Sequence, residues 1–313
     1  MNKRDAVLRL LEPDSKPEYT PAAFFTHFDP RYHEGQAAVG KHLEYFHYTG
    51  MDLVKIQYEC TFPHLPEIRR PEDWAKMPCY GLGFYEGQLR AVEGLVKAAK
   101  REALVIQTLY SSFMCAGHTT STELITDHIK QDPEKVKRGM QVITDSLMLF
   151  VKECIRLGVD GFYTSTQGGE SGRFADPVLF DTCIRPCDLA LMEEINRTCI
   201  FNILHVCDYH LPYSDMTPFV DYPGHVVNTS LHLTGGNIRA HEVASMFGRP
   251  YMGGLERKGV IATGDRREIE NAVEDVLRTA PERIILGADC TVPSETSWDN
   301  LKTAISAAHA YRR

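Results

Sequence analysis

The sequence is poor in long hydrophobic runs and in clusters of basic residues. No stretch of roughly 18 apolar residues that could span a bilayer occurs, so we expect no membrane partner. The first 19 residues carry charges throughout and lack an apolar segment, which predicts a cytoplasmic protein. The 42 acidic residues outnumber the 34 basic ones, and Lys and Arg do not alternate with aromatic residues. This charge pattern argues against nucleic acid as a partner.

Cysteine is too scattered for a disulfide framework. The nine cysteines are odd in number and are spread over a long chain, which favours buried thiols or a metal site. No Gly/Ser-rich linker, internal repeat or low-complexity tract divides the 313 residues, and α/β barrels of about 250 residues or more form one unit. We therefore expect one domain that spans residues 1–313.

Short β-rich runs alternate with segments that could form helices. Near-continuous apolar strands separated by helices are typical of a parallel sheet that is buried on both faces. A count of eight favours closure into a (β/α)8 TIM barrel over an open doubly wound sheet, and we expect a helical extension before the first strand. The eight predicted strands are 22–28, 51–57, 103–110, 159–166, 199–206, 225–230, 249–254 and 283–289.

Two helices and one long loop can be placed from local signals. Asp132 followed by proline predicts the cap and the first position of a helix over 133–157. A Thr-x-x-Asp pattern from Thr296 predicts the start of the last helix, 297–311. The connection 60–88 is rich in Pro and Gly and is too long for an ordinary βα loop. It forms either a lid over the barrel mouth or a decorative loop.

His205 and Cys207 stand two positions apart at the end of the fifth predicted strand. Because side chains alternate along a strand, both lie on one face. Cys290 follows the eighth predicted strand, 83 positions after Cys207 (290 minus 207), and a closed barrel brings both strand ends to one rim. Thiolate and imidazole are preferred zinc ligands, and three protein ligands leave a fourth position for water or substrate. The three residues predict a catalytic zinc site, with buried thiols and a core histidine as the alternative.

Other polar residues lie near the ends of the predicted strands and are candidates for substrate binding. The run 164–170 combines small hydroxyls with paired glycines, which would let a loop approach a substrate closely. Asp289 could orient a metal ligand or cap the rim. Because strand ends meet water in any barrel, each candidate could instead be a solvated residue, and no catalytic residue is assigned. The candidates are His27, Gln57, Glu59, Gln107, Tyr163, Gln167 and Asp289.

The C-terminal third resembles a known superfamily. It reads MGGLERKGVIATG from Met252 and RIILGADCTVPSETSWDNLKTAI from Arg283, which is similar to the uroporphyrinogen decarboxylase (URO-D) superfamily. Members of that superfamily are α/β barrels in which a glycine-containing eighth strand is followed by a Pro-x-x-Thr turn, as at 293–296. The likeness covers most of the chain and is clearest from Val159 to the end. It implies a URO-D-like barrel for the whole chain.

The resemblance separates two chemistries. True uroporphyrinogen decarboxylases use no metal and hold the carboxylates of their substrate with arginines, in a signature similar to FMRQAGR. The matching residues 24–30 read FFTHFDP, so both arginines are missing, and residues 55–59 read KIQYE and lack the aspartate of the second strand. A substrate with many carboxylates needs cationic partners. Their absence argues against decarboxylation of that porphyrinogen.

The zinc-dependent corrinoid methyltransferases, such as the cobamide to coenzyme M methyltransferases, form the other branch. Their metal motif is His-x-Cys followed by a distant Cys, and His205, Cys207 and Cys290 match it position by position. The resemblance implies a methyltransferase that binds Zn²⁺. In that branch a methyl group moves between a corrinoid, a cobalamin-type cobamide carried on a separate small protein, and a thiol or pterin acceptor.

The fourth zinc ligand and the reaction itself stay open. Cobalamin-independent methionine synthase, on a similar barrel, adds a glutamate ligand where residues 228–230 of this chain read NTS, so His232 and Asp208 are the candidates here. A carboxy-lyase reaction on a different substrate, with zinc as Lewis acid, is one alternative. A non-catalytic partner of a corrinoid protein is another. The outer helices of the barrel could support a homodimer.

Overall fold

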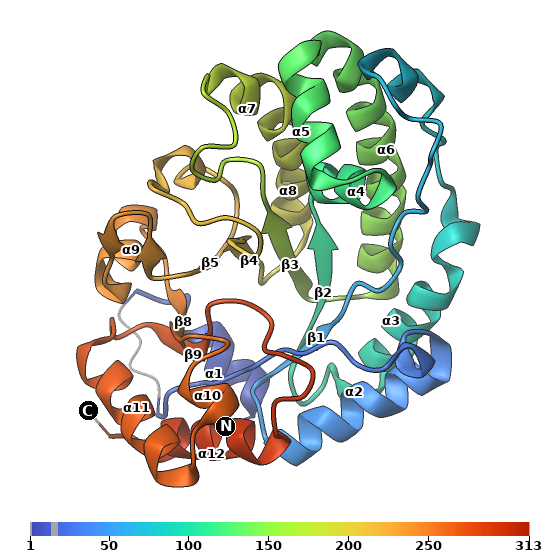
Figure 1. Ribbon diagram of the computed structural model, residues 1–313. Helices are drawn as coiled ribbons and strands as arrows, with labels where there is room; N and C mark the ends of the chain where they lie inside the picture. Colours follow the sequence, from blue (N-terminus) through green and yellow to red (C-terminus); the bar gives the residue numbers. More distant parts are fainter. Residues whose placement is uncertain (1, 14–17, 313) are drawn as a thin grey trace.

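The computed structural model describes residues 2–13 and 18–312, and in them a curled parallel sheet runs through the centre of the molecule (Figure 1). Neighbouring strands follow the order β1-β2-β3-β4-β5-β8-β9, and all of them pair in parallel. Hydrophobic side chains bury the strands on both faces, as expected of a sheet wrapped by helices. The strands are β1 Leu53–Ile56, β2 Leu104–Tyr110, β3 Gly161–Thr166, β4 Ile203–Val206, β5 Val226–Thr229, β8 Tyr251–Leu255 and β9 Ile284–Ala288.

Residues 22–28, the first predicted strand, close the barrel without forming a regular strand. Two isolated parallel bridges join this segment to the last strand and to the loop after it, at Ala22 with Leu286 and at Thr26 with Val292. On the other side, the backbone N–H just before β1 donates to the carbonyl of Ala22 (2.9 Å). The other seven predicted strands are present. The chain therefore has a TIM-like (β/α)8 fold.

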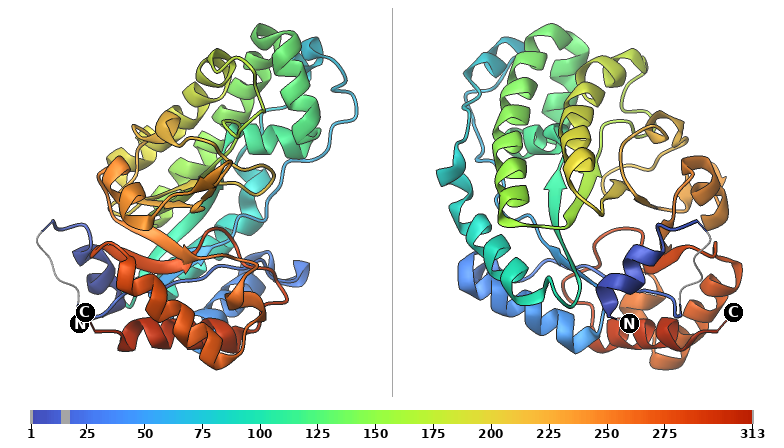
Figure 2. Two further views of the ribbon diagram at one scale, coloured as in Figure 1. Left: turned by 60° about the vertical axis from the view of Figure 1, so that its left-hand side comes forward. Right: turned by 180° about the vertical axis from the view of Figure 1, so that it is seen from behind.

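Helices surround the sheet (Figures 1 and 2). α1 precedes the closing segment and is the predicted N-terminal helical extension. A short antiparallel hairpin, β6 His232–Leu233 with β7 Gly236–Asn237, stands outside the parallel sheet. Within residues 2–13 and 18–312, no helix combines the length and the apolar character that a membrane span requires. The helices are α1 Lys3–Arg9, α2 Gly35–Thr49, α3 Glu86–Ala99, α4 Ser112–Thr119, α5 Thr122–Gln131, α6 Pro133–Leu157, α7 Val178–Cys183, α8 Arg185–Thr198, α9 Ala240–Phe247, α10 Val260–Thr263, α11 Arg266–Thr279 and α12 Trp298–Ala310.

Local capping explains where two of the predicted helices begin. The Asp132 side chain accepts a backbone hydrogen bond from the first turn of α6, and Gly158 ends the helix in the left-handed region (φ 96°). This helix therefore spans the predicted range 133–157. For α12 the cap is the Ser297 side chain. The predicted cap, Thr296, is instead buried with its hydroxyl unpaired.

The connection 60–88 packs against α6 and forms part of the outer wall (Figure 1). Within it, the 3-10 helix η2 (Pro71–Lys76) buries the Trp74 side chain completely. The indole N–H of Trp74 donates to a ring nitrogen of His128 (3.0 Å), and a Cβ atom on Gly139 of α6 would approach the indole to 2.8 Å. No residue of this connection lines the cavity at the barrel mouth, which decides against a lid.

The contact between β5 and β8 is the shortest in the described sheet. Two residue pairs join these strands, whereas the other neighbouring strands share four or five. In β8, Gly253 and Gly254 have φ values of 143° and 112°, a backbone conformation that glycine adopts without a steric cost. The strand therefore leaves β5 early while it stays paired with β9.

Candidate functional site

A cavity of about 720 Å³ opens at the carboxyl ends of the parallel strands. In barrels the loops after the strands surround such a mouth, and chemistry is carried there. The closing segment and several strand ends contribute side chains to the cavity, and the three predicted metal ligands are among them. The lining residues that matter most are His27, Lys55, Thr108, Tyr163, Gln167, His205, Cys207, Arg257 and Cys290.

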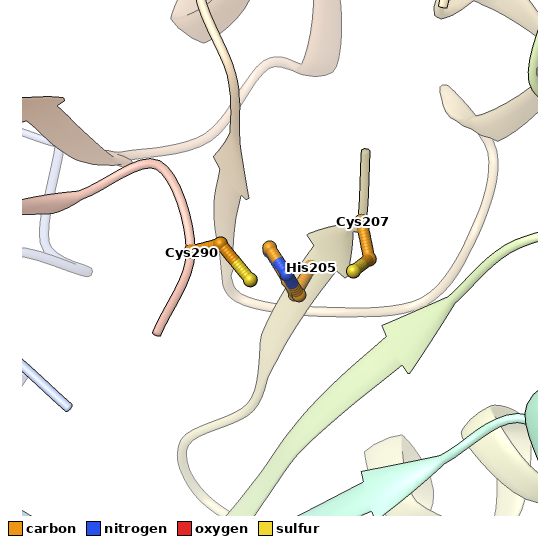
Figure 3. Close-up of side chains that lie close together, drawn as sticks. All are labelled: His205, Cys207 and Cys290. Carbon is orange, nitrogen blue, oxygen red and sulfur yellow. The ribbon is translucent and has the colours of Figure 1, made fainter. Parts of the chain in front are cut away.

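The structure brings His205, Cys207 and Cys290 together (Figure 3). Their potential ligand atoms, a nitrogen or a sulfur from each residue, all lie within 4.8 Å of one another. His205 is on β4 and Cys207 directly follows that strand, so alternation places both side chains on the same face. Cys290 reaches the same point from the loop after β9. The three residues are buried, with exposed fractions of 1%, 3% and 9%.

Hydrogen bonds to the backbone and to the sulfur hold Cys207 in place. Its N–H donates to the carbonyl of Thr166 (3.1 Å), which continues the pairing of β3 with β4. Its carbonyl accepts from the hydroxyl of Tyr213 (3.2 Å). The side-chain amide of Gln167 donates to the Cys207 sulfur at 3.3 Å. An amide that donates to a sulfur stabilises its negative charge, which a metal-binding thiolate requires.

The imidazole of His205 has no hydrogen-bond partner for either ring nitrogen. Both nitrogens are buried, and neither is satisfied by any residue that the structure describes. The ring lies against Tyr163, with ring centroids 4.9 Å apart. A buried polar atom without a partner costs roughly 1–3 kcal/mol, and coordination of a metal ion would satisfy one of the two nitrogens. An unpaired imidazole beside two thiols is a donor set that fits zinc.

The two cysteine side chains lie close together and affect each other's ionisation. The interaction with Cys290 lowers the pKa of Cys207, and the interaction with Cys207 raises the pKa of Cys290 well above that of an ordinary thiol. Burial adds to the rise at Cys290, and the neighbouring His205 opposes it. The amide of Gln167 also lowers the pKa of Cys207. A cation bound between the sulfur atoms would favour the thiolate form of both. The pair is therefore suited to bind a metal ion.

Arg257 joins the two loops that carry the cysteines. Its guanidinium contacts the carboxylate of Asp208, which follows Cys207, at 3.0 Å and that of Asp289, which precedes Cys290, at 3.2 Å. The backbone N–H of Arg257 also donates to Asp289 (2.7 Å). Burial raises the pKa of Asp289, and the charge of Arg257 opposes that rise. One arginine therefore holds both loops together beside the two cysteines.

Lys55 lies in the cavity although the sequence pattern did not single it out. It is in the middle of β1, and only 6% of the residue is exposed. Its ammonium is 4.6 Å from the ring centre of Phe25 and 4.7 Å from that of Tyr163. Burial lowers the pKa of Lys55 to about 7, and the charges of both site cysteines and of Glu59 oppose that shift. Its one signal in the sequence is a charged residue within a predicted strand, which does not show that the ammonium is buried.

Three of the seven candidates for substrate binding line the cavity, namely His27, Tyr163 and Gln167. Glu59 is not among the lining residues and lies beside His27, whose ring nitrogen is 3.0 Å from its carboxylate. Asp289 is likewise outside the lining and accepts hydrogen bonds from Arg257. The cavity wall therefore includes His27 directly, with Glu59 behind it.

The last two candidates, Gln57 and Gln107, are buried around the lining residue Thr108. The hydroxyl of Thr108 donates to the side-chain carbonyl of Gln57 (3.4 Å). The amide of Gln107 donates to the backbone carbonyl of Thr108 (2.8 Å), and its own carbonyl accepts from Gln88 (3.4 Å). Because neighbours on a strand face opposite sides, Gln107 points away from the cavity that Thr108 lines.

Neither residue suggested as a fourth ligand joins the cluster of His205, Cys207 and Cys290. Among the residues that the structure describes, the cluster consists of the His and the two Cys side chains alone. His232 is exposed in the β6–β7 hairpin and its ring contacts the side chain of Asn237 (2.9 Å). Asp208 is engaged by Arg257. Asn228, in the segment 228–230 where the resemblance would place a glutamate, donates to two backbone carbonyls. The arrangement leaves the fourth position to a ligand from solution.

The fold is similar to several solved structures. One is a methyltransferase from Methanosarcina mazei, with a TM-score of 0.79 and 13% identity over 98% of both chains. Another is a B12-independent methionine synthase from Shewanella sp. W3-18-1, with a TM-score of 0.55 and 12% identity over 94% of both chains. A third is an endo-1,4-beta-mannanase from Rhizomucor miehei, with a TM-score of 0.50 and 12% identity over 95% of this chain and 96% of that chain. Barrels carry many unrelated reactions, so these likenesses show the fold alone.

The family is shown by the sequence. No curated protein matches the chain. Residues 46–311, however, match the family described as uroporphyrinogen decarboxylase (URO-D). This range includes every strand of the parallel sheet, the three clustered donor residues and Lys55. The chain therefore belongs to the uroporphyrinogen decarboxylase family.

Proposed function

We propose that this protein is a zinc-dependent methyltransferase, which moves a methyl group between a corrinoid on a separate protein and a thiol or pterin acceptor. The observation that carries the proposal is the buried cluster of His205, Cys207 and Cys290 at the mouth of a barrel. The similar folds of a methyltransferase and of a B12-independent methionine synthase support it. Three ligands that open onto a cavity are typical of catalytic zinc, because a fourth position is free for substrate.

Each residue of the site has a separate task in this proposal. His205, Cys207 and Cys290 hold the zinc ion, which when bound lowers the pKa of a thiol substrate so that its sulfur is ionised at neutral pH. Gln167 orients Cys207 through the hydrogen bond to its sulfur. Arg257 keeps the cysteine-bearing loops together. The cavity of about 720 Å³ has room for a small acceptor and would position it for in-line attack.

In the same proposal the corrinoid protein approaches the open mouth of the barrel. Tyr209 and Leu211, in the loop after β4, are large hydrophobic residues with exposed fractions of 61% and 40%. Tyr209 also lines the cavity. Aromatic residues at the edge of a pocket are enriched in contacts between proteins. This loop is therefore the part of the rim that we assign to the partner.

A carboxy-lyase is the competing hypothesis, because membership of the family is equally compatible with that reaction. The carboxylates of a uroporphyrinogen need several cations. Of the three Lys and Arg side chains that line the cavity, Arg257 is already paired with Asp208 and Asp289, which leaves only Lys55 and Lys258. A metal-free decarboxylation would leave the clustered thiols and imidazole without a task, whereas a carboxy-lyase that acts on a different substrate would use zinc there as a Lewis acid. The similar folds of a methyltransferase and of a B12-independent methionine synthase favour methyl transfer.

Metal analysis of the purified protein tests the zinc site. We expect about one zinc per chain in the wild type and loss of zinc in Cys207→Ser and Cys290→Ser, because each removes a thiolate ligand. Cys199→Ser is the matched control, since Cys199 is also a buried free cysteine but lies outside the cluster. A wild type without zinc, or site variants that keep it, would contradict the proposal.

The reaction is tested with methylcobalamin as donor and a small thiol as acceptor, followed by the absorption change of the corrinoid. We expect turnover with zinc-containing wild type and none with Cys207→Ser. Release of carbon dioxide from a carboxylic acid substrate by the zinc-containing protein, without methyl transfer, would establish the carboxy-lyase instead. Zinc binding without either reaction would favour a non-catalytic partner of a corrinoid protein.

A further inference from the structure

Lys55 places a buried amine in the wall of the cavity. Within residues 2–13 and 18–312, its ammonium makes no hydrogen bond and has no carboxylate within 4.0 Å. Burying an ammonium without a direct partner is unfavourable. The rings of Phe25 and Tyr163, at 4.6 and 4.7 Å, offset part of that cost through cation–π contacts. The remainder is typical of a functional site, where a ligand supplies the missing partner.

The ammonium is also next to the clustered metal ligands. The Tyr163 ring connects them, because it contacts Lys55 at 4.7 Å and lies 4.9 Å from the ring of His205. Lys55, His205, Cys207 and Cys290 line the same cavity. A small molecule in this cavity can therefore reach the metal centre with one end and the ammonium with the other.

The charge balance of the proposed zinc site leaves the ammonium of Lys55 free to bind an anionic group. Two thiolates and a neutral imidazole balance the charge of one zinc ion, so the metal centre needs no further cation. A substrate that enters as an anion adds a negative charge to a buried space, which is unfavourable without a partner. Of the other Lys and Arg residues in the lining, Arg257 is paired with Asp208 and Asp289, and Lys258 is exposed at the rim. Lys55 is the buried cation that remains.

We propose that Lys55 is the charge-selecting residue of the cavity and binds an anionic group of the substrate. The substrate class is then a small acid, with its anionic group a few bonds from the atom that meets the metal. Neutral analogues of the same size bind more weakly because they leave the ammonium unpaired, and cationic analogues are repelled. The inference rests on the proposed zinc site but is independent of methyl transfer as the reaction.

Three thiols with the same two-carbon linker test the inference. They are 3-mercaptopropionate, which is an anion, 2-mercaptoethanol, which is neutral, and cysteamine, which is a cation. Binding to the cobalt(II)-substituted full-length protein is read from the thiolate-to-cobalt absorption band, which does not require turnover. A charge-assisted contact is worth about 1.5–3 kcal/mol, so we expect the wild type to bind the anion about 10-fold or more tightly than the neutral thiol. Cysteamine should bind most weakly.

Lys55→Met removes the charge and keeps the length of the side chain. Because replacing an unpaired buried charge by an apolar group is neutral or stabilising, this variant should keep its cobalt and have a Tm no lower than the wild type. We expect it to lose the preference for 3-mercaptopropionate, and Lys55→Gln to behave alike as a second neutral variant. Lys55→Arg should keep the preference. Lys258→Met is the matched control on the same cavity and should also keep it.

The outcomes separate this inference from the proposed reaction. A preference that survives in both Lys55→Met and Lys55→Gln, equal affinity of the wild type for the three thiols, or no binding of any of them would overturn the assignment of Lys55. A preference that depends on Lys55, without any methyl transfer, would refute the proposed reaction and leave the assignment intact. Methyl transfer without a charge preference would overturn the assignment of Lys55 and leave the proposed reaction intact.

Discussion

At the scale of single residues, the amide of Gln167 is the side-chain donor to the sulfur of Cys207 (3.3 Å). Groups that hold metal ligands in place typically affect metal affinity by 10–100-fold. Gln167→Leu removes this donor while it keeps a side chain of similar size. We expect the affinity for zinc to fall by about 10-fold or more. Competition with a chromophoric chelator measures the effect.

A glutamine on the surface provides the control for this prediction. The amide of Gln141 on α6 donates to Asp145 (2.8 Å), and this pair is exposed. Gln141→Leu should therefore leave zinc affinity unchanged. Equal affinities for zinc in Gln167→Leu and Gln141→Leu would show that the hydrogen bond to Cys207 does not support the metal site.

The proximity of His205, Cys207 and Cys290 could be predicted from sequence because two general rules are enough. Strand alternation places the first two on one face, and barrel closure brings the third to the same rim. Lys55 could not be found in this way. A lysine in a strand commonly extends its ammonium to water, and only the packing of Phe25 and Tyr163 around it shows that this one is buried. That packing depends on residues far away in the sequence.

At the scale of elements, α2 is joined to β1 through a buried neutral histidine. The ring of His42 donates through Nδ1 to its own helix at the carbonyl of Ala38 (2.8 Å), and its Nε2 accepts from the backbone N–H of Gln57 (3.3 Å). Burial lowers the pKa of His42 to about 4. The acceptor role of Nε2 is lost when the ring is protonated, so the folded state favours the neutral ring.

This histidine predicts a loss of stability in acid. Between pH 6.5, the usual pKa of histidine, and pH 4 the unfolded chain binds a proton that the folded chain does not bind. The contribution of His42 is therefore complete above pH 6.5 and disappears as the pH falls to 4. A shift of this size corresponds to about 3 kcal/mol. Urea unfolding at several pH values measures it.

Variants on the same helix make the test specific to the buried ring. In His42→Gln the free energy of unfolding should depend less on pH between 6.5 and 4 than in the wild type. His47→Gln, which changes an exposed histidine of α2, should retain the wild-type dependence. If both variants retain it, the acid sensitivity arises elsewhere in the molecule.

The elements themselves could largely be predicted, and the exception has a physical reason. Residues 22–28 have the composition of a buried strand. In the structure, however, side chains from other elements form hydrogen bonds with the backbone of this segment. The carboxylate of Asp52 accepts from the N–H of Ala22 (2.8 Å), and the hydroxyl of Tyr45 donates to the carbonyl of Phe24 (2.9 Å). These bonds replace part of the ladder, and no local sequence pattern reports them.

At the scale of the whole molecule, Asp52 links the closing segment near the N-terminus and the last helix, α12, to the start of β1. Its buried carboxylate accepts from the backbone of Ala22 (2.8 Å) and from the hydroxyl of Tyr19 (2.8 Å), and it meets the ring of His309 on α12 (2.7 Å). Loss of one member of such a buried charged network costs about 3 kcal/mol or more. We therefore expect Asp52→Asn to lower the Tm by about 6 °C or more. Thermal unfolding followed by circular dichroism measures the change.

An exposed aspartate on α12 distinguishes this role from a general effect of charge. The carboxylate of Asp299 accepts from Tyr48 at the surface, where such contacts contribute little. Asp299→Asn should therefore change the Tm only slightly. A Tm for Asp52→Asn that equals that of Asp299→Asn would show that the closing segment is held by other contacts.

The short contact between β5 and β8 has a consequence for the lifetime of the protein. Cys207 follows β4 and Cys290 follows β9, so the two thiols stand on either side of the β5–β8 contact, the shortest between neighbouring strands of the described sheet. A metal ion held by both cysteines would cross-link the two sides of this contact and close a loop of 83 residues (290 minus 207). Without the ion, local opening there would expose the strands to proteases. The abundance of the protein in a cell would then follow the supply of metal.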